Sequence, residues 1–226
     1  MRPVIVILSG SGLSAESGLP TFRDAAGLWR QHSWQELASP EGWRKNPALV
    51  LEFYNERRAK AWAAQPNAAH EAMAALETKF DVFVVTQNVD ALHERAGSTN
   101  VLHVHGELAY ARSTGPARKR YRIEAAPIVL GDLCEDGSQL RPDIVWFGEE
   151  TQHMDVAREL VSGADKVLVV GTSLSVYPAA GLVDAARHDA EKVLNSLEMD
   201  QVPEGFRFEK GRATEIVPPL IASWLD

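Results

Sequence analysis

The sequence lacks the features that would place the chain outside the cell or in a membrane. Of its 226 residues only Cys134 is a cysteine, which excludes an intramolecular disulfide and fits a reducing compartment. No apolar stretch approaches the roughly 20 residues of a membrane span. The start, Met1-Arg2-Pro3 followed by five apolar residues, is too short for a secretory signal. We therefore expect a soluble, cytoplasmic protein.

Positive charge is also scarce. The chain has 23 Lys and Arg residues against 31 Asp and Glu residues, a formal net charge of -8. This balance disfavours general affinity for nucleic acid or for acidic membranes, so neither is expected as a partner. The length is sufficient to bury a sizeable core.

Short apolar runs alternate with helix-like stretches along much of the chain. The predicted strands are Val4–Leu8, Val82–Val85, Val101–Val104, Ile144–Phe147, Val167–Val170 and Val193–Leu194, and the predicted helices are Asn67–Leu76, Ala91–Ala96, Met154–Val161 and Pro178–Ala190. The runs are rich in Val and Ile and continuous, as in strands covered on both faces. This alternation predicts an α/β fold with a doubly wound parallel sheet.

Two stretches depart from this alternation and predict a smaller inserted lobe. Asp24 to about Ala64 contains no predicted strand and four of the six tryptophans, which indicates a helical insertion with Asn46-Pro47 as a cap and first-turn proline. Glu107 to about Asp143 is polar and irregular. We therefore expect a main domain made of residues 1–25, 65–106 and 144–226, and a small lobe made of residues 26–64 and 107–143.

A glycine-rich turn, Gly10-Ser11-Gly12-Leu13-Ser14-Ala15, directly follows the first predicted strand. Glycines there let the backbone turn tightly and approach a dinucleotide's pyrophosphate, although glycine turns after strands are common. A hydride-transferring Rossmann enzyme would continue with a long helix and an acidic residue at a strand end. Gly18 and Pro20 end any helix early, and Glu36 does not follow a strand, so the pattern argues against a dehydrogenase.

Polar residues follow other predicted strands. Thr86-Gln87-Asn88-Val89-Asp90 ends the second strand, and the carboxyl ends of parallel strands line the ligand crevice. The alternative is a simple helix cap at Asn88 or Asp90. Gly171-Thr172-Ser173 follows a later strand and suits contact with cofactor hydroxyls or phosphates, or an ordinary tight turn.

Two histidines, His103 and His105, end the third predicted strand and share a face of it. No cysteine or carboxylate lies at ligand spacing beside them, which disfavours a metal site. His105, before Gly106, is the better candidate for a general base near neutral pH, and a structural histidine is the alternative.

Together these segments resemble the sirtuins, NAD-dependent protein lysine deacylases with a Rossmann-like domain. The matching segments are Gly10 to Arg23 (GSGLSAESGLPTFR), Thr86-Gln87-Asn88-Val89-Asp90, His105-Gly106, Val145-Trp146-Phe147-Gly148-Glu149 and Gly171-Thr172-Ser173-Leu174, with a looser match at Asn195-Ser196-Leu197-Glu198. Ser11 stands where the family often has alanine, a small departure.

The resemblance implies that NAD is cleaved rather than reduced, giving nicotinamide, free lysine and O-acyl-ADP-ribose. It implies His105 as general base, Asn88 and Asp90 at the nicotinamide end, and Gln87 at the ribose. The cofactor-binding set it implies is Gly10, Ser11, Gly12, Ser14, Phe22, Arg23, Gln87, Asn88, Asp90, His105, Gly171, Thr172, Ser173, Asn195 and Ala213. Val145, Phe147 and Gly148 would bind the substrate peptide by strand addition. Acyl-lysine proteins are the expected partners, and the chain is expected to be a monomer or weak oligomer.

Tyr54 and Arg57 are three residues apart in the helical insertion, so on a helix they share a face. This pair resembles the one by which the desuccinylase and demalonylase branch recognises an acidic acyl group. Arg57 would hold the carboxylate with two charge-assisted hydrogen bonds and Tyr54 with one. The alternative is an arginine extending along an amphipathic helix beside a half-buried tyrosine.

One departure from the family concerns metal. Sirtuins usually carry two C-x-x-C pairs that bind a structural zinc ion, but the stretch from Arg112 to Leu140 has only Cys134. One thiolate cannot make a four-cysteine site, so no zinc is expected and the lobe must be held by packing. Other readings of the whole chain are an ADP-ribosyltransferase, against which His105 argues, and a non-catalytic NAD- or acyl-lysine-binding module.

Overall fold

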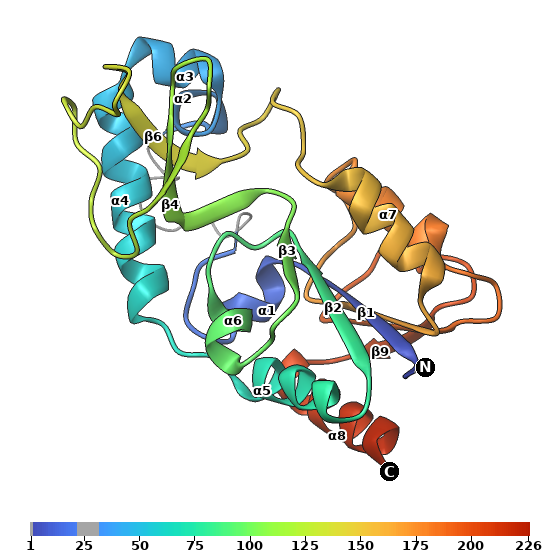
Figure 1. The fold of residues 1–226 in the computed structure, drawn as a ribbon. Helices are drawn as coiled ribbons and strands as arrows, with labels where there is room; N and C mark the ends of the chain where they lie inside the picture. Colours follow the sequence, from blue (N-terminus) through green and yellow to red (C-terminus); the bar gives the residue numbers. More distant parts are fainter. Residues whose placement is uncertain (1, 22–31) are drawn as a thin grey trace.

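The computed structural model describes residues 2–21 and 32–226, which form two sheets with helices around them (Figure 1). The main sheet has six parallel strands in the order β3-β2-β1-β7-β8-β9. Its strands are β1 (Val4–Ser9), β2 (Asp81–Thr86), β3 (Val101–His103), β7 (Lys166–Val170), β8 (Glu191–Ser196) and β9 (Arg207–Lys210). The second sheet is antiparallel, in the order β5-β4-β6. Its strands are β4 (Gly106–Ser113), β5 (Arg120–Arg122) and β6 (Leu140–Ile144).

Helices cover both faces of the main sheet, as the continuous apolar strands predict. Ile5 and Ile7 of β1 pack with helices α5 (Ala68–Ala75) and α8 (Ala213–Leu225). Because side chains alternate along a strand, Val6 and Leu8 point the other way. They pack with α7 (Met154–Gly163) and the 3-10 helix η3 (Ala179–Ala185). The expected doubly wound, Rossmann-like α/β fold is therefore confirmed.

The remaining helices are one after β1, three in the insertion, and two short ones on either side of β2. They are α1 (Ser11–Ala15), α2 (Trp34–Leu37), α3 (Pro40–Lys45), α4 (Pro47–Ala63), η2 (Leu76–Thr78) and α6 (Leu92–Ala96). The Asn46 side chain accepts the N–H of Leu49, and Pro47 occupies the first turn, so the expected start of α4 is confirmed. None of the helices in the described ranges is long and apolar enough to cross a bilayer.

Helix α4 lies along the small sheet and closes a third core with it (Figure 1). This core contains Phe53 and Tyr54 from α4, Leu108 from β4, and Trp146, which follows β6. The four aromatic and aliphatic side chains are each at least 95% buried. The insertion and the second irregular stretch of the sequence thus share a hydrophobic core, which fixes α4 against the small sheet.

Two predicted elements are wrong. The run from Ile144 to Phe147 is no strand of the main sheet: β6 ends at Ile144 and the chain then turns, with the N–H of Glu149 bonded to the carbonyl of Trp146. The apolar residues of this run fill the core of the small lobe instead. The helix expected from Pro178 to Ala190 is only the short 3-10 helix η3, since it contains the poor helix former Gly181 and is followed by a polar turn.

A chain of buried polar side chains lies behind the ends of β1 and β2. The Ser9 hydroxyl donates to Thr86 Oγ1 (2.7 Å) and lies 2.8 Å from His93 Nε2. The His93 ring meets His70 edge-on, with ring centroids 5.0 Å apart, and both rings are about 99% buried or more. Burial lowers the pKa of His70 to about 4 and that of His93 well below its ordinary value, so both are neutral near pH 7.

The neutral state of His70 gives a stability that depends on pH. Its folded-state pKa lies below the unfolded one, so this contribution is present above about pH 6.5 and is lost as pH falls toward 4. In urea unfolding, the wild-type protein should lose about 2 kcal/mol more than His70→Gln between pH 7.5 and 5. Parallel pH curves for the two proteins would contradict this assignment.

Candidate active site

The glycine turn is held against the loop that follows β7 by contact between backbones. The N–H of Gly12 donates to the Gly171 carbonyl (2.8 Å) and that of Gly10 to Val170 (3.0 Å). A Cβ on Gly12 would lie 2.8 Å from the Gly171 carbonyl oxygen, and one on Gly171 would lie 2.2 Å from the Leu13 nitrogen. Side chains are therefore excluded at these positions. The glycines bring two strand ends together, a role that the sequence did not indicate.

Ser14, Asn88 and Asp90 form a buried cluster at this junction. Asn88 Nδ2 donates to the Gly10 carbonyl (3.1 Å) and to Ser14 Oγ (3.0 Å), and Ser14 Oγ donates to Asp90 Oδ2 (2.9 Å). Burial raises the pKa of Asp90, against the effect of its hydrogen bonds from Ser14 and Leu92. The helix-cap alternative holds in part, because Asp90 Oδ1 accepts the N–H of Leu92 at the start of α6.

His105 faces the same crevice. Its Nδ1 lies 3.2 Å from the Gln87 carbonyl, which can only accept, so Nδ1 carries the proton and Nε2 keeps its lone pair. Burial lowers the pKa of His105, against a smaller opposite effect of this bond. The Gln87 side chain donates to Thr172 Oγ1 (3.2 Å), which joins the loops after β2 and β7. The ring is thus neutral near pH 7, and its Nε2, which has no hydrogen-bond partner among the described residues, is able to accept a proton.

Both ring nitrogens of the second histidine, His103, have hydrogen-bond partners. Its Nδ1 lies 2.8 Å from the Asn88 carbonyl and its Nε2 2.8 Å from a Glu94 carboxylate oxygen. With Glu107 these groups form a cluster whose potential ligand atoms lie within 4.8 Å of one another. Folding therefore supplies carboxylates that the spacing along the sequence did not indicate. However, Glu107 accepts from Arg120, and both ring nitrogens of His103 have partners. The cluster therefore stabilises the loop through hydrogen bonds.

The remaining expected cofactor residues occupy different surroundings. Asn195 is 1% exposed, and its Nδ2 donates to the carbonyls of Glu209 and Gly211. The N–H of Ala213, at the start of α8, donates to the Glu16 carboxylate. Ser11 lies in α1 and Ser173 is exposed beside Thr172. Phe22 and Arg23 lie outside the described residues. Contact of any of these residues with NAD stays a prediction.

Tyr54 and Arg57 lie together on α4, as their spacing predicts. Tyr54 is 4% exposed, and the Arg57 guanidinium lies 5.5 Å from the Phe53 ring centroid. Burial lowers the pKa of Arg57, while Tyr54 and Asp90 act in the opposite direction. Among the described residues Arg57 has no ion pair and no hydrogen bond, whereas its neighbour Arg58 bonds to Leu108 and Asn55.

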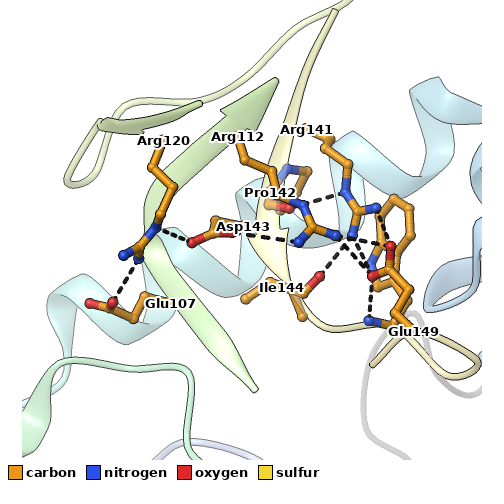
Figure 2. A network of polar contacts seen from close by, with 9 residues as sticks. Glu107, Arg112, Arg120, Arg141, Pro142, Asp143, Ile144 and Glu149 are labelled. Atoms are coloured by element: carbon orange, nitrogen blue, oxygen red, sulfur yellow. Dashed lines mark hydrogen bonds and ion pairs between the residues drawn. The ribbon is translucent and has the colours of Figure 1, made fainter. Parts of the chain in front are cut away.

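An ion network that the sequence did not indicate joins the small sheet to the segment after β6 (Figure 2). Arg112 donates to both carboxylate oxygens of Glu149 (2.9 and 3.0 Å), and Arg141 does the same (2.8 and 2.9 Å). Glu149 also accepts the N–H of Trp146 (2.8 Å). Burial acts to raise the pKa of Glu149, but these bonds outweigh it and the pKa is lowered. Asp143, paired with Arg120, continues the network across the sheet.

The segment from Val145 to Glu149, which was expected to be a strand, is not a strand in the structure. The N–H of Val145 donates to the His105 carbonyl (2.9 Å) and that of Phe147 to the Ala38 carbonyl (3.0 Å). These donors are therefore not available to a substrate strand. Phe147 is 39% exposed, and its ring lies 4.8 Å from that of Trp34. Substrate contact by Val145, Phe147 and Gly148 stays a prediction.

A four-cysteine zinc site does not fit the residues present. Cys134, the single cysteine of the chain, donates toward Ser113 Oγ (3.1 Å) and Asp136 Oδ1 (2.8 Å). No second thiol exists to join it. The ion network of Glu149 and the α4 core connect the parts of the small lobe.

The fold and crevice define the class of protein: a dinucleotide-binding α/β protein with a small lobe beside the cleft. The Sir2 family model matches residues 10–178. A Helicobacter pylori protein named NAD-dependent protein deacylase is 54% identical over 186 residues, 82% of this chain and 79% of that protein. A Pasteurella multocida protein of the same name is 46% identical over 232 residues, 98% and 97% of the two chains.

Solved structures of Sir2 proteins are also similar to this chain. A Sir2 homologue in complex with NAD superposes with a TM-score of 0.88 at 39% identity, covering 98% of this chain and 89% of that one. A second Sir2 structure, a complex with a deacetylated peptide and 3'-O-acetyl ADP-ribose, gives a TM-score of 0.81 at 29% identity over 98% of this chain and 94% of that one. The chain belongs to the Sir2 family.

Removal of the central charge of the network should destabilise the lobe. Glu149→Gln leaves Arg112 and Arg141 buried without their shared carboxylate, so the free energy of unfolding should fall by about 3–5 kcal/mol. Urea unfolding measures this, with the exposed neighbour Glu150→Gln as control, which should change the value by less than about 0.5 kcal/mol. Equal stability of the two variants would show that the network is not structural.

Proposed function

We propose that the chain is an NAD-dependent protein-lysine deacylase that prefers succinyl and malonyl groups. Membership of the Sir2 family and the relatives named as NAD-dependent protein deacylases support the deacylase activity. The acyl preference depends on one observation: the half-buried Arg57 has no anionic partner among the described residues and lies beside the buried hydroxyl of Tyr54. A carboxylate at the end of the acyl chain is the ligand that this pair fits.

The two parts of the chain have different roles in this proposal. Residues 1–25, 65–106 and 144–226 bind NAD, and residues 26–64 and 107–143 form the small lobe. NAD supplies the ribose: nicotinamide leaves from its anomeric carbon, and the acyl group is transferred to a ribose hydroxyl oxygen. Asn88 and Asp90 hold the nicotinamide end and Gln87 the ribose, next to the glycine turn. We further propose that the protein is cytoplasmic, contains no zinc, and is a monomer or weak oligomer.

His105 acts as the general base in this proposal. Its protonated Nδ1 is held by the Gln87 carbonyl, so Nε2 accepts a proton from the ribose hydroxyls. The leaving nicotinamide is neutral and the sugar becomes cationic, so the site needs oriented dipoles rather than a strong acid. The fixed amide of Asn88 and the buried Asp90 provide them.

Selectivity between acyl groups tests the role of Arg57. With matched peptides, the wild-type protein should give a higher kcat/KM for succinyl- and malonyl-lysine than for acetyl-lysine. Arg57→Ala should lower the succinyl-to-acetyl ratio about 100-fold because two charge-assisted hydrogen bonds are lost. The exposed Arg44→Ala on α3 is the control and should leave the ratio unchanged. Equal turnover of all three peptides by the wild-type protein would contradict the acyl preference.

The pH profile tests His105. A base with a lowered pKa stays neutral below the ordinary value of 6.5, so kcat/KM should be nearly level from pH 8 to 6.5 and decline only below that. His105→Ala should lower kcat at least 100-fold at every pH. The exposed His188→Asn serves as control and should keep the wild-type profile. A wild-type profile that declines already between pH 8 and 7 would argue against His105 as the base.

A further inference from the structure

The indole N–H of Trp146 is buried without a hydrogen-bond partner among the described residues. The side chain is only 2% exposed, so solvent does not replace the missing partner. Buried donors in proteins are nearly always paired, and an exception calls for an explanation such as an absent ligand. The unpaired N–H therefore marks a place where an acceptor is expected.

The position of the indole is fixed from several sides. The N–H of the preceding residue, Val145, bonds to the carbonyl of His105, and the main-chain N–H of Trp146 bonds to Glu149. The Arg141 guanidinium lies over the indole ring, 3.1 Å from its centroid. The ring centroids of Trp43 and Trp146 are 5.6 Å apart. Trp146 is thus held rigidly next to the loop that carries His105.

The charges around the indole are of both signs. The Tyr54 ring centroid lies 6.5 Å from that of Trp146, on the helix that also carries Arg57. Burial raises the pKa of Tyr54, and the Glu149 carboxylate adds to this rise. Arg57 and the Trp146 side chain oppose it. Glu149 is already bonded to Arg141, whereas Arg57 has no hydrogen bond or ion pair among the described residues. The Arg57 guanidinium and the indole N–H therefore favour an anion with several acceptor positions.

We propose that Trp146 Nε1 is a third donor for the carboxylate of an acidic acyl group, together with Tyr54 and Arg57. The inference rests on the proposed function. A carboxylate has about four acceptor positions. The fork of Arg57 fills two, Tyr54 one and Trp146 one. An acetyl group has no acceptor at this distance and leaves the indole N–H unpaired, so Trp146 adds to the discrimination against short neutral acyl groups.

Trp146→Phe tests this role because phenylalanine keeps an aromatic ring under Arg141 and removes only the donor and part of the ring. The succinyl-to-acetyl ratio of kcat/KM should fall about tenfold, mainly through a higher KM for the succinyl peptide. Trp43→Phe, which changes a neighbouring tryptophan of the same core, should keep the wild-type ratio. An unchanged ratio in Trp146→Phe, or an equal loss for both peptides, would overturn the proposal.

A failure of the proposed function can be distinguished from a failure of the proposed role of Trp146. If the wild-type protein itself shows no succinyl preference, the proposed function fails; if it shows one that Trp146→Phe retains, only the role of Trp146 fails. A second measurement applies if the variant does not fold. In wild-type protein with 15N-labelled tryptophan, one indole N–H resonance should move downfield with a succinyl-lysine peptide and not with an acetyl-lysine peptide. Identical indole spectra with both peptides would overturn the proposal.

Discussion

The close approach of Gly12 and Gly171 sets the geometry on which the site depends. A Cβ on either residue would overlap backbone of the other loop, so the loops that follow the paired strands β1 and β7 pack this closely only because both positions are glycine. This contact brings the loop of Thr172 to that of Gln87, and it presents the Gly10 carbonyl to Asn88. Fixed hydrogen-bonding groups of this kind are what catalysis by oriented dipoles requires.

The small lobe adds charge to this crevice in two different ways. Arg112 and Arg141 share the carboxylate of Glu149, which holds the segment of Trp146 against the small sheet. Arg57, on the same side of the lobe, has no such partner among the described residues. A half-buried cation without a counter-ion is less favourable than a paired one. In the proposed function, an anionic acyl group supplies this counter-ion.

The sequence predicted the main sheet well because its strands are buried on both faces and therefore continuously apolar. It also predicted that Asn88, Asp90 and His105 would lie at one crevice, since parallel strands place their ends together. It failed at Ile144 to Phe147, where an equally apolar run fills the lobe core rather than the sheet. The network of Glu149 could not be predicted, because its partners come from separate strands and only folding brings them together.

Product analysis tests the central claim most directly. The protein is incubated with NAD and a succinyl-lysine peptide, and all species are followed by mass spectrometry. The proposed function predicts equimolar nicotinamide, unmodified lysine peptide and O-succinyl-ADP-ribose. Nicotinamide release accompanied by ADP-ribose attached to peptide or protein, or no loss of the succinyl group, would contradict it.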